Sequence, residues 1–439
     1  MGIMGFQENS KKKVAIVGFG ILGAVATYFL DKNKFQIHLF DLDNDLRQPD
    51  FFPDPKGPSS LHQSRSIPKG SPGNAAFWSY AVTNCIVDRS KWSSKFLQAV
   101  PHLSEQLKEI GFPKMKLQVH DQQTFLKISY VNSQKLNNVF QSARKDTRVK
   151  RHFNLVQNIA HTKQGIKISY RDSKNHLQNN DFDMAIVCAG PICTFNLLNA
   201  SNILPESQTI SYFDHPTFWL GTISLKRKKW IHRRFRNRVV TSGKRPGALV
   251  ISTEQGYAIT LRIRPLNRDL PRNFEDKKIR KFLWRAANSL DFRVLRKFGL
   301  YFCKSFSIAA SLDFQKAFLR ADLNESGSIE SFDYKSDFNH IDLATLQLID
   351  QKLLENFGMF QKSWDNNKRD FRGTPAAHFT GFLAEFDKLH LWTSTDSGDH
   401  RDFPKILVPG GVMFPESVIG HPTYMALLTL LYEINKMNA

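Results

Sequence analysis

The chain has 439 residues, which is too long for one ordinary hydrophobic core and predicts two closely packed domains. Hydrophobic residues make up 41% and phenylalanine occurs 36 times, enough for a full, aromatic-rich interior. The formal charge of +21 favours an acidic partner, such as an anionic substrate, a phosphate, nucleic acid or an anionic surface, and it also aids solubility.

Cysteine content and hydropathy exclude two classes of protein. Four cysteines are too few for a disulfide framework in a chain of this length, and a reducing compartment is the default. No apolar run reaches the roughly 20 residues that a membrane helix needs. The sequence therefore predicts a cytoplasmic protein with no transmembrane segment.

The first unit is a strand, a glycine turn and a helix within residues 14–30. We expect the strand at 14–17, the helix at 24–30 and a second strand at 35–41. A charged patch and an apolar run also begin a secretory signal peptide, but no small-residue cleavage site follows here. The order of strand, turn, helix and strand is typical of the βαβ unit that binds a dinucleotide.

Each part of this G-x-G-x-x-G unit has a physical role. Gly18 permits the tight turn, Gly20 lets the backbone approach a pyrophosphate, and Gly23 lets the helix pack on the strand. The helix N-terminus offers free N–H groups and a positive dipole end. Asp41, at the end of the second strand, is predicted to bind a ribose, with Asp43 as the alternative.

The middle of the chain predicts further strands. We expect a strand at 152–162, a hairpin with a polar turn at 165–181, and a buried strand in 181–190 that ends in Ala-Gly. Cys188 and Cys193 have the C-x4-C spacing of disulfide reductases, but they are better explained as small core residues.

A basic run follows at 226–247. It contains ten Lys or Arg residues and no acid, with Trp230 and Phe235 between them. Such a run is predicted either to bind nucleic acid or another polyanion, or to be a solvated connection. Strands are predicted on both sides of it, in 209–225 and 247–263, which favours a hairpin connection.

Residues 322–333 match the pattern of an EF-hand calcium loop. A helix is predicted before it at 314–321, Gly327 falls at the sharp turn, and Ile329 takes the hydrophobic position. A surface turn is the simpler interpretation, because position 12 is an aspartate and the loop is single. The candidate Ca²⁺ ligands are Asp322, Asn324, Ser326, Ser328, Glu330 and Asp333.

Two more helices and a glycine turn complete the predicted elements. The helices are expected in 89–111 and 340–358. Residues 405–434 predict a strand, a Gly-Gly turn, a loop and a long final helix.

This layout resembles the FAD-dependent oxidoreductases of the D-amino-acid oxidase and sarcosine oxidase superfamily. The resemblance rests on 14–41, 181–190 and 406–430. It implies FAD as cofactor, with a Ser-, His- and Arg-containing loop in 59–67 along the pyrophosphate and flavin, where His62 matches a histidine that some members bond to the flavin. It also places Val156, in the strand predicted at 152–162, near the adenine. Together with Gly18, Gly20, Gly23 and Asp41, the implied cofactor-binding residues are Ser59, Ser60, His62, Arg65, Val156, Ala189, Gly190, Gly410, Gly411 and Gly420.

The sequence departs from some flavoproteins of this fold. Many carry an acid just after the C-terminal glycines, whereas Val412 and Met413 follow here and Glu416 comes later. This favours an oxidase or dehydrogenase over a monooxygenase. The covalent-flavin cysteine near the C-terminus is absent, since the last cysteine is Cys303.

The expected fold class is α/β, with a Rossmann-type FAD-binding domain and a second domain of antiparallel sheet plus helices that binds substrate. We expect the FAD-binding domain to comprise 1–85, 150–205 and 370–439, and the substrate domain to comprise 86–149 and 206–369.

The resulting expectation is an enzyme, an FAD-dependent oxidase or dehydrogenase. It would oxidise a C–N or C–O bond of a small anionic substrate, such as an amino acid or amine, by hydride transfer to the flavin. Arg65, Tyr257, Arg262 and Arg264 are the candidate catalytic residues; the two arginines of the predicted strand share a face and suit a carboxylate. Two alternatives stay open: a flavoenzyme that modifies RNA or a protein through 226–247, and a non-catalytic flavin-fold binding protein.

Overall fold

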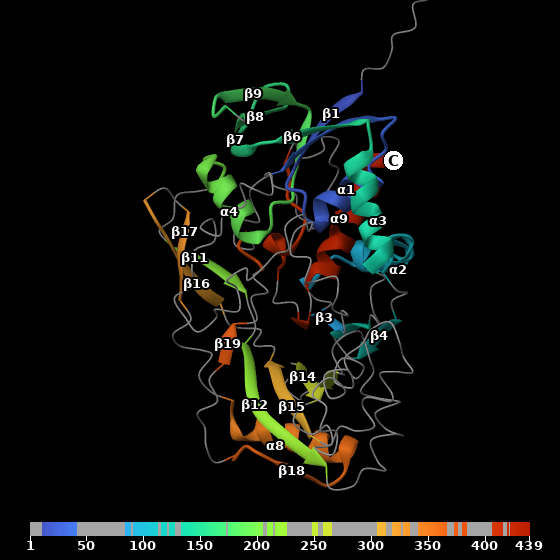
Figure 1. Ribbon diagram of the computed structural model, residues 1–439, viewed down its shortest axis with the longest axis vertical. Coiled ribbons are helices and arrows are strands. Elements are labelled where there is room, and N and C mark those ends of the chain that lie inside the picture. Colours follow the sequence, from blue (N-terminus) through green and yellow to red (C-terminus); the bar gives the residue numbers. More distant parts are fainter. Residues whose placement is uncertain are drawn as a thin grey trace, which may run out of the picture.

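The computed structural model describes the central elements of both predicted domains (Figure 1). Its described residues are 11–41, 84–88, 91–112, 116–120, 123–127, 133–172, 174–204, 209–213, 216–225, 248–252, 258–265, 305–312, 318–325, 328–333, 341–366, 373–375, 380–383, 406–415, 419–420 and 422–439.

A five-stranded parallel sheet forms the centre of the first domain. Several strands that are neighbours in this sheet are far apart in the sequence, and every described pairing in it is parallel. Parallel strands with buried faces are typical of doubly wound folds. In spatial order the strands are β20 (Ile406–Leu407), β10 (Met184–Val187), β1 (Lys12–Val17), β2 (Phe35–Asp41) and β6 (Val149–Phe153).

Alternate residues of β1 face two different cores. Val14 and Ile16 pack against helices, whereas Ala15 and Val17 face the other side of the sheet. The helices on the first side are α1 (Ile21–Phe29), α2 (Ser94–Glu109), α3 (Ser133–Lys145) and α9 (Pro422–Asn438). The second side is covered by α4 (Pro191–Ala200) and by an antiparallel meander of β7 (Leu155–His161), β8 (Ile166–Arg171) and β9 (Leu177–Phe182).

The final helix returns to the first βαβ unit. The side-chain oxygen of Asn438 accepts a hydrogen bond of 3.0 Å from the N–H of Asp31, and its side-chain nitrogen donates one of 2.8 Å to the carbonyl of Phe29. The side chain of Lys34 donates to the backbone carbonyl of Asn438. Residues about 400 positions apart are thus hydrogen-bonded at the turn between α1 and β2.

A six-stranded antiparallel sheet forms the second domain. One face packs on α8 (Leu343–Phe357), which lies at the end of the molecule away from the parallel sheet (Figure 1). The main path of strands is β13 (Ala248–Ser252), β14 (Ala258–Pro265), β15 (Ser305–Leu312), β12 (Pro216–Leu225) and β18 (Phe360–Lys362), with β19 (Gly373–Pro375) also paired to β12.

Two smaller sheets adjoin these layers. The first consists of β11 (Thr209–Phe213), β16 (Phe318–Leu323) and β17 (Ile329–Asp333). The second consists of β21 (Ile419–Gly420), β3 (Asn84–Asp88), β5 (Gln123–Lys127) and β4 (Lys116–His120).

The mixed α/β class and the combination of a parallel sheet with an antiparallel sheet plus helices are confirmed. The helices expected in 89–111 and 340–358 are α2 and α8. The hairpin expected at 165–181 is formed by β8 and β9. The domain boundaries stay a prediction; α2 and α3, from the part assigned to the substrate domain, share the helix-side core of the parallel sheet.

The helix expected at 314–321 is wrong. Residues 318–323 form β16, which pairs with β11 and, through a hairpin, with β17. Ala321 and Ile329 are buried in the core beneath this sheet. Asp322 pairs with Ser331, and Asn324 and Ser328 close the turn with hydrogen bonds of 2.9 Å, so the helix that precedes a calcium loop is missing. Among the described residues no group of three or more His, Cys, Asp or Glu side chains is arranged to hold a metal.

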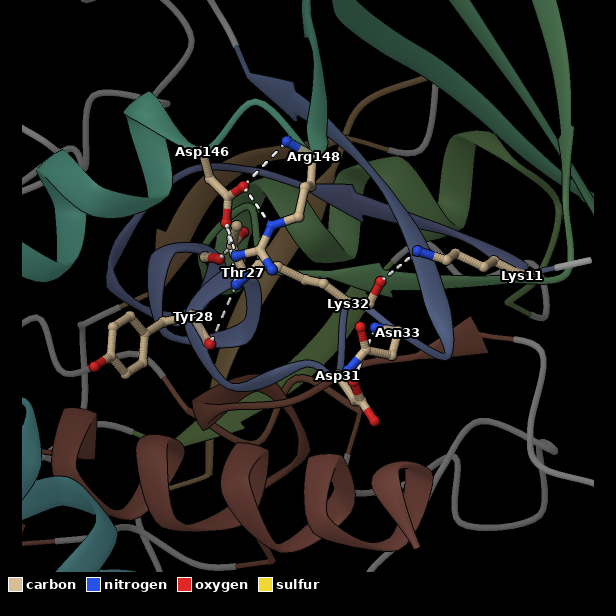
Figure 2. A network of polar contacts seen from close by, with 9 residues as sticks. Lys11, Thr27, Tyr28, Asp31, Lys32, Asn33, Asp146 and Arg148 are labelled. Atoms are coloured by element: carbon tan, nitrogen blue, oxygen red, sulfur yellow. Dashed lines mark hydrogen bonds and ion pairs between the residues drawn. The ribbon is translucent and has the colours of Figure 1, made fainter.

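A polar network joins the turn after α1 to the turn after α3 (Figure 2). Arg148 donates two side-chain hydrogen bonds of 3.0 Å to Asp146, and Lys32 lies 3.4 Å from the same carboxylate. Hydrogen bonds from Arg148 hold the pKa of Asp146 well below its usual range. The network lies at the end of the parallel sheet opposite the glycine turn, so its role is structural.

We predict that Asp146→Asn lowers the free energy of unfolding by about 1–3 kcal/mol at pH 7, because it weakens hydrogen bonds to a charged acceptor. Urea denaturation measures the change. The matched control is Glu105→Gln, which removes an exposed ion pair with Lys108 and should cost less than about 1 kcal/mol. Equal losses in the two variants would contradict the prediction.

Two histidines face the meander side of the parallel sheet. His38 Nδ1 lies 3.1 Å from His152 Nε2, and Phe40 stacks on His152 with ring centroids 4.4 Å apart. Burial, followed by the charges of His152, Lys150 and Lys13, lowers the pKa of His38 to about 4. Burial also lowers the pKa of His152.

This pair predicts a loss of stability in mild acid. The unfolded state takes up a proton on His38 near pH 6.5 and the folded state only near pH 4, so stability falls as the pH drops through this range. Urea denaturation at pH 7 and pH 5 should show a smaller loss in His38→Asn than in the wild type. The exposed His102, on α2, provides the control variant His102→Asn, which should keep the wild-type loss. An unchanged loss in His38→Asn would refute the prediction.

Candidate functional site

The turn between β1 and α1 depends on two very close backbone approaches. Gly18 has a φ of +98°, and a Cβ there would lie 2.7 Å from the carbonyl oxygen of Cys188. A Cβ on Gly23 would lie 1.9 Å from the carbonyl oxygen of Gly18. Only glycine therefore permits α1 to pack this tightly on the end of β1.

Gly20 differs from both, because no described residue crowds the position of its missing Cβ. In the described part of the chain a Cβ there would meet only the Cys188 carbonyl oxygen, at 4.0 Å, and the φ of −73° suits any residue. Gly20 is the N-cap of α1 and offers no capping side chain; the first helical bond runs from Ala24 N to Gly20 O. The N–H groups of the first turn of a helix have no intrahelical acceptor and attract anions.

Asp41 lies beside this turn at the carboxyl end of β2. Its Oδ1 accepts a hydrogen bond of 3.3 Å from the N–H of Phe19, the middle residue of the G-x-G sequence. The carbonyl of Phe40 accepts from Gly18 N at 2.8 Å. The predicted ribose acid is therefore held next to the predicted pyrophosphate turn.

The carboxyl end of β10 reaches the same place. Cys188 follows β10 directly, and its N–H donates to the carbonyl of Val17 at 2.7 Å. Ala189 and Gly190 come next, and Gly190 is the N-cap of α4. Burial raises the pKa of both the Cys188 and the Cys193 thiol, and both cysteines are free, which supports their interpretation as core residues rather than as a redox pair.

The C-terminal glycine turn completes the edge. A Cβ on Gly410 would lie 2.8 Å from Cδ1 of Leu22, in the first turn of α1. Gly411 begins a 3₁₀ turn, η7 (Gly411–Met413), and its carbonyl accepts from Gly381 N at 2.7 Å. Described residues of the three segments on which the resemblance rests, 14–41, 181–190 and 406–430, therefore meet at one edge of the parallel sheet.

A short strand links this edge to the second domain. β21 contains Gly420, pairs with β3 through Cys85, and contacts both β14 and β15. In Figure 1 β3 lies between the parallel sheet and these strands. Arg262 and Arg264 are two positions apart in β14 and pair with Ala309 and Ser307 of β15. The predicted shared face of the two positions agrees with this register.

The remaining predicted site residues divide into two groups. Val156 is buried in the core between the meander and the parallel sheet, in the cluster that contains Phe40. The others lie outside the described residues, as does the basic run 226–247: Asp43, Ser59, Ser60, His62, Arg65 and Tyr257. No nucleic-acid partner gains support from the described part of the chain.

Two contacts in this site were not predicted from the sequence. They are the carbonyl of Cys188 against Gly18 and the side chain of Leu22 against Gly410. Both join residues that are at least 170 positions apart in the sequence. In the described residues no helix is long and apolar enough to cross a membrane.

Comparison with solved structures identifies the architecture. Pyridoxine 4-oxidase from Mesorbium loti aligns over 97% of this chain and 99% of its own, with a TM-score of 0.50 and 10% identity. The fold is shared with this oxidase.

Two other solved structures align less well. A putative FAD-containing monooxygenase from Photorhabdus luminescens subsp. laumondii TTO1 has a TM-score of 0.38 and 12% identity, over 98% of this chain and 88% of its own. CabE, an aromatic hydroxylase from angucycline biosynthesis, has a TM-score of 0.35 and 8% identity, over 98% and 62%. No protein family matches the sequence, and no curated protein does. The resemblance to the D-amino-acid oxidase and sarcosine oxidase superfamily stays a prediction.

Proposed function

We propose that the protein is an FAD-dependent oxidoreductase that oxidises a C–N or C–O bond of a small anionic substrate by taking a hydride from the carbon of that bond. The observation that carries the proposal is the turn at Gly18, Gly20 and Gly23. At two of these glycines protein backbone occupies the space that a Cβ would need. At the third, Gly20, no described residue fills the space in front of the helix N-terminus beside Asp41. The shared fold with an oxidase supports the same conclusion.

Residues of this chain fit the parts of FAD. The first-turn N–H groups of α1 would bind the pyrophosphate, and Asp41 would accept hydrogen bonds from the ribose. We propose that Ala189, Gly190, Gly410, Gly411 and Gly420 lie along the cofactor, together with Ser59, Ser60, His62 and Arg65, and that Val156 lies near the adenine. When bound, the flavin supplies the redox chemistry, and the protein orients the substrate and excludes water.

The C-terminal glycines favour oxidase or dehydrogenase chemistry over hydroxylation. Val412 is buried after Gly411, and no acid occupies the positions of η7. The fold is shared with an enzyme named as an oxidase, which agrees with this choice of chemistry.

Gly20→Val tests the cofactor assignment. The wild type should bind FAD and purify yellow, whereas the variant should fold and bind no FAD, because a side chain would fill the space in front of the helix N-terminus. Absorption spectra and FAD titration by fluorescence measure binding, and circular dichroism confirms folding. Gly23→Ala is the matched variant: it should destabilise the fold itself, because its Cβ would meet the Gly18 carbonyl. A wild type that binds NAD and no flavin would overturn the FAD assignment.

Arg262 and Arg264 are the proposed partners of the substrate anion. We expect one of these two arginines to bind the substrate carboxylate. Its replacement, by Arg262→Met or Arg264→Met, should raise KM about 10- to 100-fold, because a charge-assisted hydrogen bond is lost. The flavin spectrum should not change. Arg171→Met, in the meander, is the control and should keep the wild-type KM. If neither variant of β14 changes KM, the assignment to these arginines is wrong.

A further inference from the structure

Strand β12 contains a bulge immediately after Trp219. Trp219 pairs with Ala309, but the pairing with β15 resumes at Gly221 with Ile308, so Leu220 is an extra residue. Bulges of this kind are common beside active sites, where they change the direction of a side chain.

Contacts to the neighbouring segment fix the bulge. Gly221 has a φ of +139°, and a Cβ there would lie 2.5 Å from Oγ of Ser363. The same hydroxyl accepts a hydrogen bond of 2.8 Å from Thr222 N, and Ser363 N donates to the carbonyl of Thr222 at 2.9 Å. The backbone that follows Trp219 is therefore held in place by Ser363.

Trp219 lies on the face of the sheet opposite α8. The residues on either side of it, Phe218 and Leu220, belong to the core that α8 covers, as do the neighbours of Ala309 in β15. Side chains alternate along a strand, so Trp219 and Ala309 share the other face. Trp219 is 59% exposed there, although a large aromatic side chain is usually buried.

The pairing register places an arginine in line with Trp219. Trp219, Ala309 and Arg262 lie side by side on three neighbouring strands, and we call these three positions the row. Trp219 pairs with Ala309, and Ala309 pairs on its other side with Arg262. Adjacent strands are about 4.8 Å apart, so the two outer positions are separated by about 10 Å. The middle position holds only a methyl group, and serines occupy the neighbouring positions of this face in β15, Ser307 and Ser311. The centre of the row therefore has small side chains.

Two strands of the row contact the segment that contains Gly420. β21, which contains Gly420 and precedes α9, contacts both β14 and β15. β15 is the central strand of the row and carries Ala309 between the other two members.

We propose that Trp219 determines specificity and that the substrate is an aromatic carboxylate whose ring packs on this indole while its anionic group pairs with Arg262. A planar ring with a carboxylate spans the row, whereas a short aliphatic acid reaches only one side of it. Ring packing of this kind favours aromatic over saturated ligands. The inference rests on the proposed function, because it assigns the substrate of the same site.

Ligand binding to the flavin-loaded protein tests the inference. The probes are phenylacetate, cyclohexylacetate of similar size without a planar ring, and phenylacetamide without a charge. The wild type should bind phenylacetate most tightly. Trp219→Ala should weaken phenylacetate about 3- to 10-fold, with little change for cyclohexylacetate, and Trp219→Phe should restore the preference. Leu354→Ala, which truncates an exposed side chain on α8, is the matched control and should bind as the wild type does.

Equilibrium dialysis of the three probes separates the two proposals. If the protein binds FAD but Trp219→Ala and Leu354→Ala bind phenylacetate equally well, the inference is wrong and the proposed function stands. If the wild type prefers cyclohexylacetate or binds phenylacetamide as tightly as phenylacetate, the substrate class is wrong. If no FAD binds, the proposed function fails, and the inference, which rests on it, is overturned with it.

Discussion

The contact between Gly23 and the carbonyl of Gly18 is the constraint on which the first domain depends. It lets α1 begin directly above the end of β1, and this sets the distance between the helix and the parallel sheet. The other motifs are arranged around that turn: Cys188 approaches Gly18 from β10, and Gly410 approaches Leu22 from the C-terminal segment. A larger residue at position 23 would separate the helix from the strand and disturb each of these approaches together.

Local sequence was sufficient to predict those elements in which the hydrophobic pattern of the sequence agrees with the burial of the residues in the fold. The strand, turn, helix and strand of residues 14–41 were predicted because hydrophobic periodicity, glycine spacing and the terminal acid all indicated the same unit. The segment 314–321 failed for the opposite reason. Its composition favours a helix, but Ala321 has to pack in the core beneath a sheet, and pairing with β11 outweighs the local preference.

The candidate site could be predicted only in part, because its residues come from distant segments. Gly18, Gly20 and Asp41 follow from a known spacing, and the register now supports a common face for Arg262 and Arg264. The bulge at Trp219 left no signal in the sequence, because an extra residue in a strand is visible only when its partner strand is known. The contact of Leu22 with Gly410 is likewise a property of the assembled fold.

The hydrogen bonds between Asn438 and the turn after α1 have a consequence for synthesis on the ribosome. The helix-side core contains α1 from the start of the chain and α9 from residues 422–438. The first βαβ unit therefore emerges long before α9, which packs against its helix side. Such long-range closure slows folding and exposes hydrophobic surface in the interim, so the nascent protein is expected to depend on chaperones until α9 is made.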